Sequence, residues 1–210
     1  MERWEDILVR QGCVVLKKFN KEDVVDLANS LGDLVADTNT GEAVRVISPM
    51  QDGLSGRSLS SKYGMGSFPF HTELAYWRTP PRYLLLFCVD PGQGARPTGY
   101  FDPLACPAIP VELYEAQYKV RRSSGSFIAR CLEKTTGGTR VRADAECMIP
   151  LVRSSDPLNE FLMKQVETGV IWHHWTAGDL LLLDNWRFMH GRGSSTRKDP
   201  ERKLIRVMIS

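Results

Sequence analysis

A histidine and a carboxylate stand two residues apart in the apolar, aromatic stretch 68–77. Residues i and i+2 of an extended segment point to the same side, so His71 and Glu73 can reach one point in space while Thr72 faces away. A further histidine would complete the set of two histidines and one carboxylate that holds non-heme Fe(II) with open coordination positions. By itself the pair is weak evidence, because short motifs arise by chance and a surface or core-edge pair looks the same.

His190 is the best-placed third ligand among the four histidines of the chain. It follows the segment 178–189, at the mouth of a predicted buried strand, and we expect it to close the metal site from the opposite sheet. Taken alone, His190 could equally be a core histidine with satisfied hydrogen bonds. The tandem His173 and His174 lie on a predicted strand beside two tryptophans, which indicates packing, since only one of them can face inward.

Two arginines near the end of the chain have the spacing of an anion-binding pair. Arg202 and Arg206 are an even number of residues apart, so a strand presents both guanidinium groups on one face. Arginines that face the interior of a β-barrel need an anion, and guanidinium is suited to a bidentate grip on a carboxylate.

Short strands separated by turns make up most of the chain. Strands are predicted at 12–17, 43–48, 83–89, 96–102, 126–130, 139–142, 170–175, 179–184 and 203–209, and helices at 20–31, 111–117 and 158–168. The turn 135–138 is predicted to join two of these strands, 126–130 and 139–142, as a hairpin. The pattern indicates a mainly β protein with flanking helices (α+β) around a two-sheet jelly roll, a cupin-like double-stranded β-helix.

We expect a single domain over residues 1–210, because the chain shows no internal repeat and no linker. The Gly/Ser-rich segment 49–67 lies just before the His-x-Glu pair, where an active-site lid would sit. A plain surface loop is the alternative interpretation of this segment.

The composition is that of an ordinary globular protein and points to no macromolecular partner. Hydrophobic residues are 42%, charged residues 25%, and the net charge is +2. No basic run interleaved with aromatic residues suggests nucleic-acid binding, and no apolar run is long enough to span a membrane. The charged amino terminus lacks a signal-peptide core, and five widely spaced cysteines fit reduced thiols, so we expect a cytoplasmic protein.

Five blocks occur in one order between about Gly12 and Ile209: Phe-x-His-Thr-Glu, then Pro-x-Tyr-Leu and a turn leading to Thr, then Gly-Asp with apolar residues, then Asp-Asn with His-Gly-Arg, and finally Arg-x-x-x-Arg. Together they resemble the Fe(II)/2-oxoglutarate-dependent dioxygenases of the taurine dioxygenase (TauD/TfdA) and clavaminate synthase-like superfamily. This chain has Glu73 where aspartate is commoner, which is similar to the clavaminate synthase and amino-acid hydroxylase branch.

The resemblance implies a role for each residue of the site. His71, Glu73 and His190 would bind the catalytic iron, and O2 would be a further reactant. Arg202 would clamp the distal carboxylate of the cosubstrate 2-oxoglutarate with help from Thr98. Arg206 would contact either the proximal carboxylate of the cosubstrate or an acidic group of the substrate. From its place in the chain, Asp184-Asn185 is expected to form a turn or to support the ligands by orienting the loop that carries His190.

The implied reaction is the oxidation of a C–H bond of a small substrate, with release of succinate and CO2. Hydroxylation is the default, and desaturation, cyclisation or epoxidation would use the same residues. The expected substrate bears a carboxylate, as an amino acid derivative or a natural-product intermediate does. Its candidate contacts are Arg57, Ser58, Tyr63, Tyr76 and Arg192, although Tyr76 could be pocket wall or core and Arg192 could be a surface residue.

Other functions remain open at the level of sequence. A non-catalytic jelly-roll binding or sensor module would have a damaged triad or lack Arg202, and the sequence shows neither. A cosubstrate-independent iron oxygenase or a zinc enzyme would not need Thr98 and Arg202. A carrier protein that presents the substrate, or a homo-oligomer, is also compatible with the chain.

Overall fold

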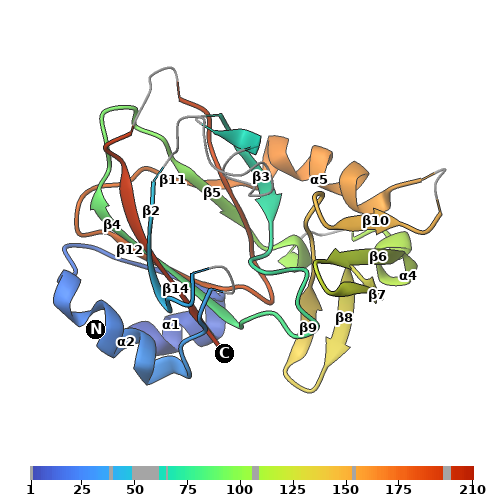
Figure 1. Cartoon of the computed structure of the whole chain (residues 1–210), viewed down its shortest axis with the longest axis horizontal. Coiled ribbons are helices and arrows are strands. Elements are labelled where there is room, and N and C mark those ends of the chain that lie inside the picture. The colour runs from blue at the N-terminus through green and yellow to red at the C-terminus, as the bar shows by residue number, and fades with distance from the viewer. Residues whose placement is uncertain are drawn as a thin grey trace.

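The computed structural model describes residues 2–37, 40–48, 62–64, 66–105, 109–152, 155–195 and 200–210, apart from the side chains of 165–168. Two sheets face each other, two helices cover the outside of one of them, and a lobe of short strands and helices flanks the pair (Figure 1). The predicted mainly β architecture with flanking helices is confirmed.

The larger sheet has five antiparallel strands in the order β1-β12-β4-β14-β2. Its strands are β1 (Cys13–Leu16), β12 (Leu180–Asp184), β4 (Tyr83–Asp90), β14 (Lys203–Ile209) and β2 (Val44–Ile47). The helices on its outer face are α1 (Trp4–Gln11) and α2 (Val24–Leu31), the latter preceded by a 3-10 turn, η1 (Lys21–Asp23).

The central strands of this sheet are apolar along their whole length because both of their faces are buried. On β4, Leu85 and Phe87 pack with Leu8 of α1 and Leu27 of α2 in one core cluster. The alternate residues of β4 face the second sheet and belong to a second cluster. The same alternation on β14 turns Arg206 inward.

The smaller sheet has four antiparallel strands in the order β11-β5-β13-β3. Its strands are β11 (Ile171–His173), β5 (Thr98–Phe101), β13 (Met189–Arg192) and β3 (Phe68–His71). Tyr100 of β5 and Phe188 before β13 complete the apolar core between the two sheets.

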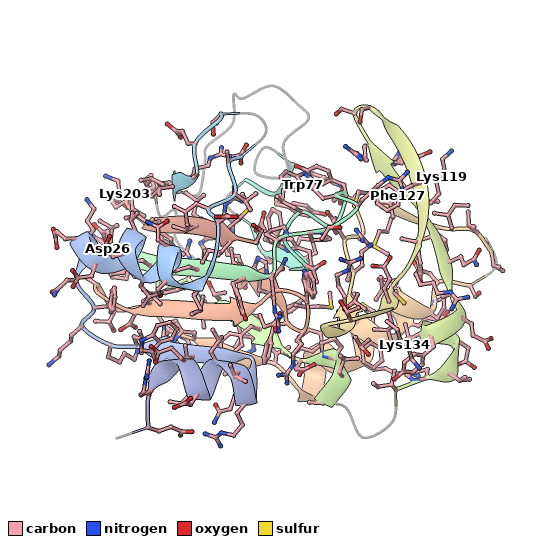
Figure 2. All side chains as sticks on the ribbon, turned by 90° about the horizontal axis from the view of Figure 1, so that it is seen from below. Asp26, Trp77, Lys119, Phe127, Lys134 and Lys203 are labelled. Carbon is pink, nitrogen blue, oxygen red and sulfur yellow. The ribbon has the colours of Figure 1, made fainter. Side chains whose placement is uncertain are left out.

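The lobe has its own sheet, β10-β6-β7, and a separate hairpin, β8-β9. Its elements are η2 (Pro103–Ala105), α4 (Val111–Glu115), β6 (Gln117–Arg122), β7 (Gly125–Arg130), β8 (Leu132–Thr135), β9 (Gly138–Val141), β10 (Met148–Pro150) and α5 (Pro157–Thr168). Figure 2 shows Lys119, Phe127 and Lys134 of the lobe at the opposite end of the molecule from Asp26 and Lys203. Phe101 and Met189 of the smaller sheet pack into the lobe core, which joins the two parts.

Three features of the lobe and the amino terminus differ from the sequence-based expectation. The predicted hairpin between 126–130 and 139–142 is wrong, because the turn 135–138 joins β8 to β9 while β7 pairs with β6. Strand β6 was not predicted, although its buried residues Tyr118 and Val120 alternate with exposed ones. Helix α1 was also not predicted; its apolar stripe is short, with Leu8 buried and Trp4 and Ile7 partly buried against the same core.

Most of the predicted lid, 49–67, lies outside the described residues, and so do Arg57 and Ser58. Within the described part of the chain, none of the helices has both the length and the hydrophobicity needed to cross a bilayer. The cysteines that the structure describes, Cys13, Cys88, Cys131 and Cys147, are free thiols.

Candidate active site

The two histidines of the candidate site lie side by side in the smaller sheet. His71 is the last residue of β3 and is the direct cross-strand partner of His190 on β13, with ring centroids 4.3 Å apart. The expectation that His190 approaches from the opposite sheet is therefore wrong. A turn in which Arg187 and Phe188 hydrogen-bond to the carbonyl of Asp184 ends β12, and the chain then enters the smaller sheet next to β3.

Glu73 follows β3 in a turn and brings its carboxylate to the two imidazoles. One donor atom from each of His71, Glu73 and His190 lies within 4.8 Å of the others. Oε2 of Glu73 is 3.6 Å from Nε2 of His190. Two donors bound at about 2.1 Å to one first-row metal ion at a right angle are about 3 Å apart, so a small adjustment brings this pair to coordination geometry.

The hydrogen bonds and charges around the three residues suit metal ligation. Nδ1 of His71 lies 3.0 Å from the carbonyl oxygen of Pro69, so a proton on Nδ1 leaves Nε2 free to coordinate. Burial, followed by the neighbouring His71, lowers the pKa of His190 to about 4. Burial alone would raise the pKa of Glu73, but Arg206 and then His190 hold it well below its usual range. Glu73 is thus ionised and His190 neutral at neutral pH, the states that bind a metal.

Asn185 fixes the backbone of Glu73. Its Oδ1 accepts a hydrogen bond from the Glu73 amide at 2.7 Å, and its Nδ2 donates to the Glu73 carbonyl at 3.1 Å. Nδ2 also donates to the carbonyl of Pro81 at 2.9 Å. The sequence-based expectation connected Asn185 with the His190 loop. Asn185 follows β12 on the way to β13, but its side chain supports the loop of the other ligand.

The candidate ligands open onto a cavity of about 140 Å³, roughly ten times the volume that one water molecule requires. The predicted cosubstrate residues all line it: Thr98 from β5, Arg202 just before β14, and Arg206 within β14. Apolar side chains complete the walls, among them Ile47, Phe68, Leu86 and Leu204. The cavity therefore joins a candidate metal centre to hydrogen-bond donors for an anion.

Arg206 uses both of its terminal nitrogens on carboxylates of the protein. Nη1 donates to Oε1 of Glu73 at 3.0 Å, and Nη2 donates to Oδ2 of Asp37 at 2.9 Å. These bonds use two of the five N–H donors of the guanidinium group, and Nε has no hydrogen-bond partner among the described residues. Asp37 was not singled out in the sequence, where an isolated aspartate before a predicted strand carries no distinguishing signal.

The candidate substrate residues are placed differently from one another. Arg192 lines the cavity and donates to the carbonyls of Gly64 and Gly66 at 2.7 and 2.8 Å.

Tyr63 hydrogen-bonds to Glu146 of the lobe, and its ring packs on Phe68 with centroids 5.0 Å apart. Tyr76 is partly buried and packs against both neighbouring apolar cores. Neither tyrosine is among the described residues that line the cavity.

Trp175 orients the hydroxyl group of Thr98 by a hydrogen bond. The indole Nε1 of Trp175 donates to Oγ1 of Thr98 at 2.9 Å, so the Thr98 hydroxyl proton is free to point elsewhere. His173, which the sequence placed as packing, is buried edge-on against the Trp175 ring. Thr98 is thereby set to donate a hydrogen bond into the cavity.

We predict that Trp175→Phe raises the KM for 2-oxoglutarate about 5-fold and leaves kcat nearly unchanged, because it removes one hydrogen bond that orients Thr98. Steady-state succinate formation at varied 2-oxoglutarate measures the effect. Trp172→Phe is the matched control, since Trp172 is 42% exposed and lies on β11, the strand next to β5. An equal KM in both variants would show that Trp175 does not act through Thr98.

The sequence matches the family described as "Taurine catabolism dioxygenase TauD, TfdA family" over residues 1–98 and 153–208, which is more than half of the chain. The chain belongs to this family of Fe(II)/2-oxoglutarate-dependent oxygenases. The predicted family is thus confirmed. No curated protein matches the sequence.

Solved structures share the TauD/TfdA fold at low sequence identity. An asparagine oxygenase in complex with Fe(II), 2S,3S-3-hydroxyasparagine and succinate aligns with a TM-score of 0.71 at 17% identity, covering 94% of this chain and 74% of that one. The non-heme iron oxygenase OrfP, in complex with Fe, succinate and (3S)-hydroxy-L-Arg, gives 0.74 at 20%, covering 98% and 77%. A taurine dioxygenase from Burkholderia xenovorans gives 0.72 at 16%, covering 100% and 82%. These likenesses confirm the jelly-roll fold class.

The family match leaves out residues 99–152, which include most of the lobe. Residues of this segment hold the loop after His71 by hydrogen bonds. The backbone amide of Thr72 donates to the carbonyl of Ala143 at 2.7 Å, and the amide of Ala143 donates to Oγ1 of Thr72 at 3.1 Å. Arg142, which is fully buried, donates to the carbonyls of Ala75, Trp77 and Arg78. The lobe therefore supports the candidate ligand loop on both sides of Glu73.

Proposed function

We propose that this protein is an Fe(II)/2-oxoglutarate-dependent oxygenase that hydroxylates a small, carboxylate-bearing substrate such as an amino acid derivative or a natural-product intermediate. The observation that carries the proposal is the convergence of His71, Glu73 and His190 beside Thr98 and Arg202 in one cavity. Two imidazoles and one carboxylate suit Fe(II) and leave coordination positions for the other reactants.

Each residue has a defined task in this proposal. Bound iron would use 2-oxoglutarate and O2 to oxidise a C–H bond, with succinate and CO2 as by-products. His71, Glu73 and His190 hold the iron, and Arg202 and Thr98 hold the distal carboxylate of 2-oxoglutarate by a charge-assisted grip and a hydrogen bond. The apolar walls restrict the orientation of the substrate. Which C–H bond reacts then depends on how the substrate is held.

The environment of Arg192 favours a substrate that carries an anionic group. It lines the cavity, and burial, followed by the charge of Arg96, lowers its pKa to about 10. Among the residues that the structure describes, its hydrogen-bond acceptors are neutral carbonyls and no carboxylate pairs with it. A half-buried cation without a carboxylate favours an anionic ligand. The hydroxylated amino acids in the asparagine oxygenase and OrfP structures support a substrate of this class.

We also propose that the described parts of the chain act as one domain. The lobe core includes Phe101 and Met189 from the smaller sheet, and the lobe holds the loop that carries Glu73. Removal of the lobe would therefore expose the barrel core and release the candidate ligand loop.

Anaerobic addition of Fe(II) and 2-oxoglutarate tests the proposed function. We expect the weak visible charge-transfer band of the iron chelate, followed in air by succinate formation that a panel of L-amino acids, their derivatives and carrier-tethered forms stimulates. Acids should stimulate more than the corresponding amides if Arg192 binds an anion. Absence of the band together with absence of succinate across the panel would contradict the enzyme and favour a binding module.

A further inference from the structure

The guanidinium group of Arg206 bridges two buried carboxylates from different parts of the fold. Glu73 lies on one side at 3.0 Å and Asp37 on the other at 2.9 Å. The side chains of Arg206, Glu73 and Asp37 are 15%, 11% and 7% exposed, so solvent screens these ion pairs weakly. The two contacts use both terminal nitrogens of Arg206 and set the direction of its planar fork.

Asp37 is itself anchored. Its amide donates to the carbonyl of Glu42 at 2.9 Å, and its carbonyl accepts from the amide of Gly41 at 2.7 Å. Oδ2 of Asp37 also accepts a hydrogen bond from Arg45 on β2, which is the direct cross-strand partner of Arg206 on β14. Two like charges opposite each other destabilise a sheet, and the Asp37 carboxylate between them offsets that repulsion.

Glu73 reaches Arg206 across the cavity, since Glu73 follows β3 of the smaller sheet and Arg206 lies on β14 of the larger one. Arg206 holds Oε1, while Oε2 faces Nε2 of His190 at 3.6 Å. An aspartate at this position would be shorter by one C–C bond, about 1.5 Å. Glu73 therefore has the length to contact the opposite sheet and still present one oxygen to a metal.

We propose, on the basis of the proposed role of Glu73 as an iron ligand, that Asp37 and Arg206 are positioning residues of the metal site. Asp37 fixes Arg206, and Arg206 fixes the Glu73 carboxylate so that only Oε2 is offered to the metal. The main task of Arg206 is then to hold Glu73, and not to bind the cosubstrate or the substrate. The grip on 2-oxoglutarate falls to Arg202 and Thr98, and Arg192 is left for the anionic group of the substrate.

The matched variants Arg206→Lys and Arg45→Lys test this proposal. Both keep the positive charge beside Asp37, but a single ammonium group at position 206 cannot bridge two carboxylates as a guanidinium does. Anaerobic calorimetric titration with Co(II), in the absence of 2-oxoglutarate, measures metal affinity without any turnover. We expect Arg206→Lys to weaken Co(II) binding at least about 10-fold, as supporting residues of metal sites typically do. Arg45→Lys should stay within about 2-fold of the wild type.

Asp37→Asn tests whether Asp37 acts through Arg206. It should also weaken Co(II) binding about 10-fold. The double variant, Asp37→Asn with Arg206→Lys, should bind Co(II) with an affinity within about 2-fold of that of Arg206→Lys alone. If Asp37→Asn does not fold, the comparison of Arg206→Lys with Arg45→Lys tests the positioning role by itself. At saturating Co(II), the affinity of Arg206→Lys for 2-oxoglutarate should stay within about 3-fold of the wild type, less than the loss of a charge-assisted bond would cause.

Three results separate the proposals. A wild-type protein that does not bind Co(II) would contradict the proposed function itself. A wild type that binds Co(II) while Arg206→Lys binds it equally well would overturn only the positioning role. A loss of 2-oxoglutarate affinity of about 10-fold or more in Arg206→Lys, with Co(II) binding unchanged, would assign Arg206 to the cosubstrate instead.

Discussion

Replacing His71 by alanine is expected to eliminate tight metal binding and, with it, succinate formation. Only Glu73 and His190 would remain, and two donors cannot define the facial geometry that three provide. We expect Co(II) affinity to fall more than about 100-fold, beyond the 10- to 100-fold that supporting residues typically cause. His71 lies at the end of β3 and is only partly buried, so the fold should tolerate the change.

Thermal unfolding with and without Co(II) makes this prediction independent of turnover. At a Co(II) concentration 100 times Kd, binding adds about 2.7 kcal/mol of stability to the wild type. For a domain of this size the gain corresponds to a rise in Tm of about 5–11 °C. His71→Ala should lose the rise, whereas His174→Ala, which removes an exposed histidine, should keep it. A Co(II)-dependent rise of the same size in both variants would place the metal elsewhere.

Replacing Arg142 by methionine is expected to destabilise the protein by about 3–5 kcal/mol, because it leaves several buried acceptors without a donor. Arg142 is 0% exposed and donates to the carbonyls of Trp77 and Arg78 at 2.6 and 2.9 Å, to the carbonyl of Ala75, and to Glu133 at 3.2 Å. Methionine fills most of the space but makes none of these bonds. The loop that follows Glu73 should therefore loosen.

Thermal and urea unfolding followed by circular dichroism measure this effect, with an expected decrease in Tm of about 6–20 °C. Arg130→Met is the matched control in the same lobe, since Arg130 is exposed at the end of β7. Co(II) affinity should fall in Arg142→Met at temperatures where the variant is still folded, and it should be unchanged in Arg130→Met. Stabilities of the two variants within 1 kcal/mol of each other would mean that the loop carbonyls find other donors.

Local patterns predicted those parts of the site that depend only on neighbouring residues in the chain. The apolar runs of β4 and β12 indicated strands buried on both faces, and the even spacing of Arg202 and Arg206 placed both on the inner face of β14 and its approach. His71 and Glu73 converge as the extended segment suggested, although Glu73 lies in the turn beyond β3. Periodicity of this kind reports which face of a strand is buried, and it requires no knowledge of the partner strand.

The sequence by itself thus determined the family, the mainly β fold class and the residues of the candidate triad. The tertiary structure alone decided which residues contact the members of the candidate site. His190 lies beside His71 in one sheet, Asn185 supports Glu73 across 112 residues of chain, and Asp37 holds Arg206 across 169. Contacts so distant in the chain leave no periodic trace in either segment, because they depend on strand order and register, and these follow from the packing of the whole core.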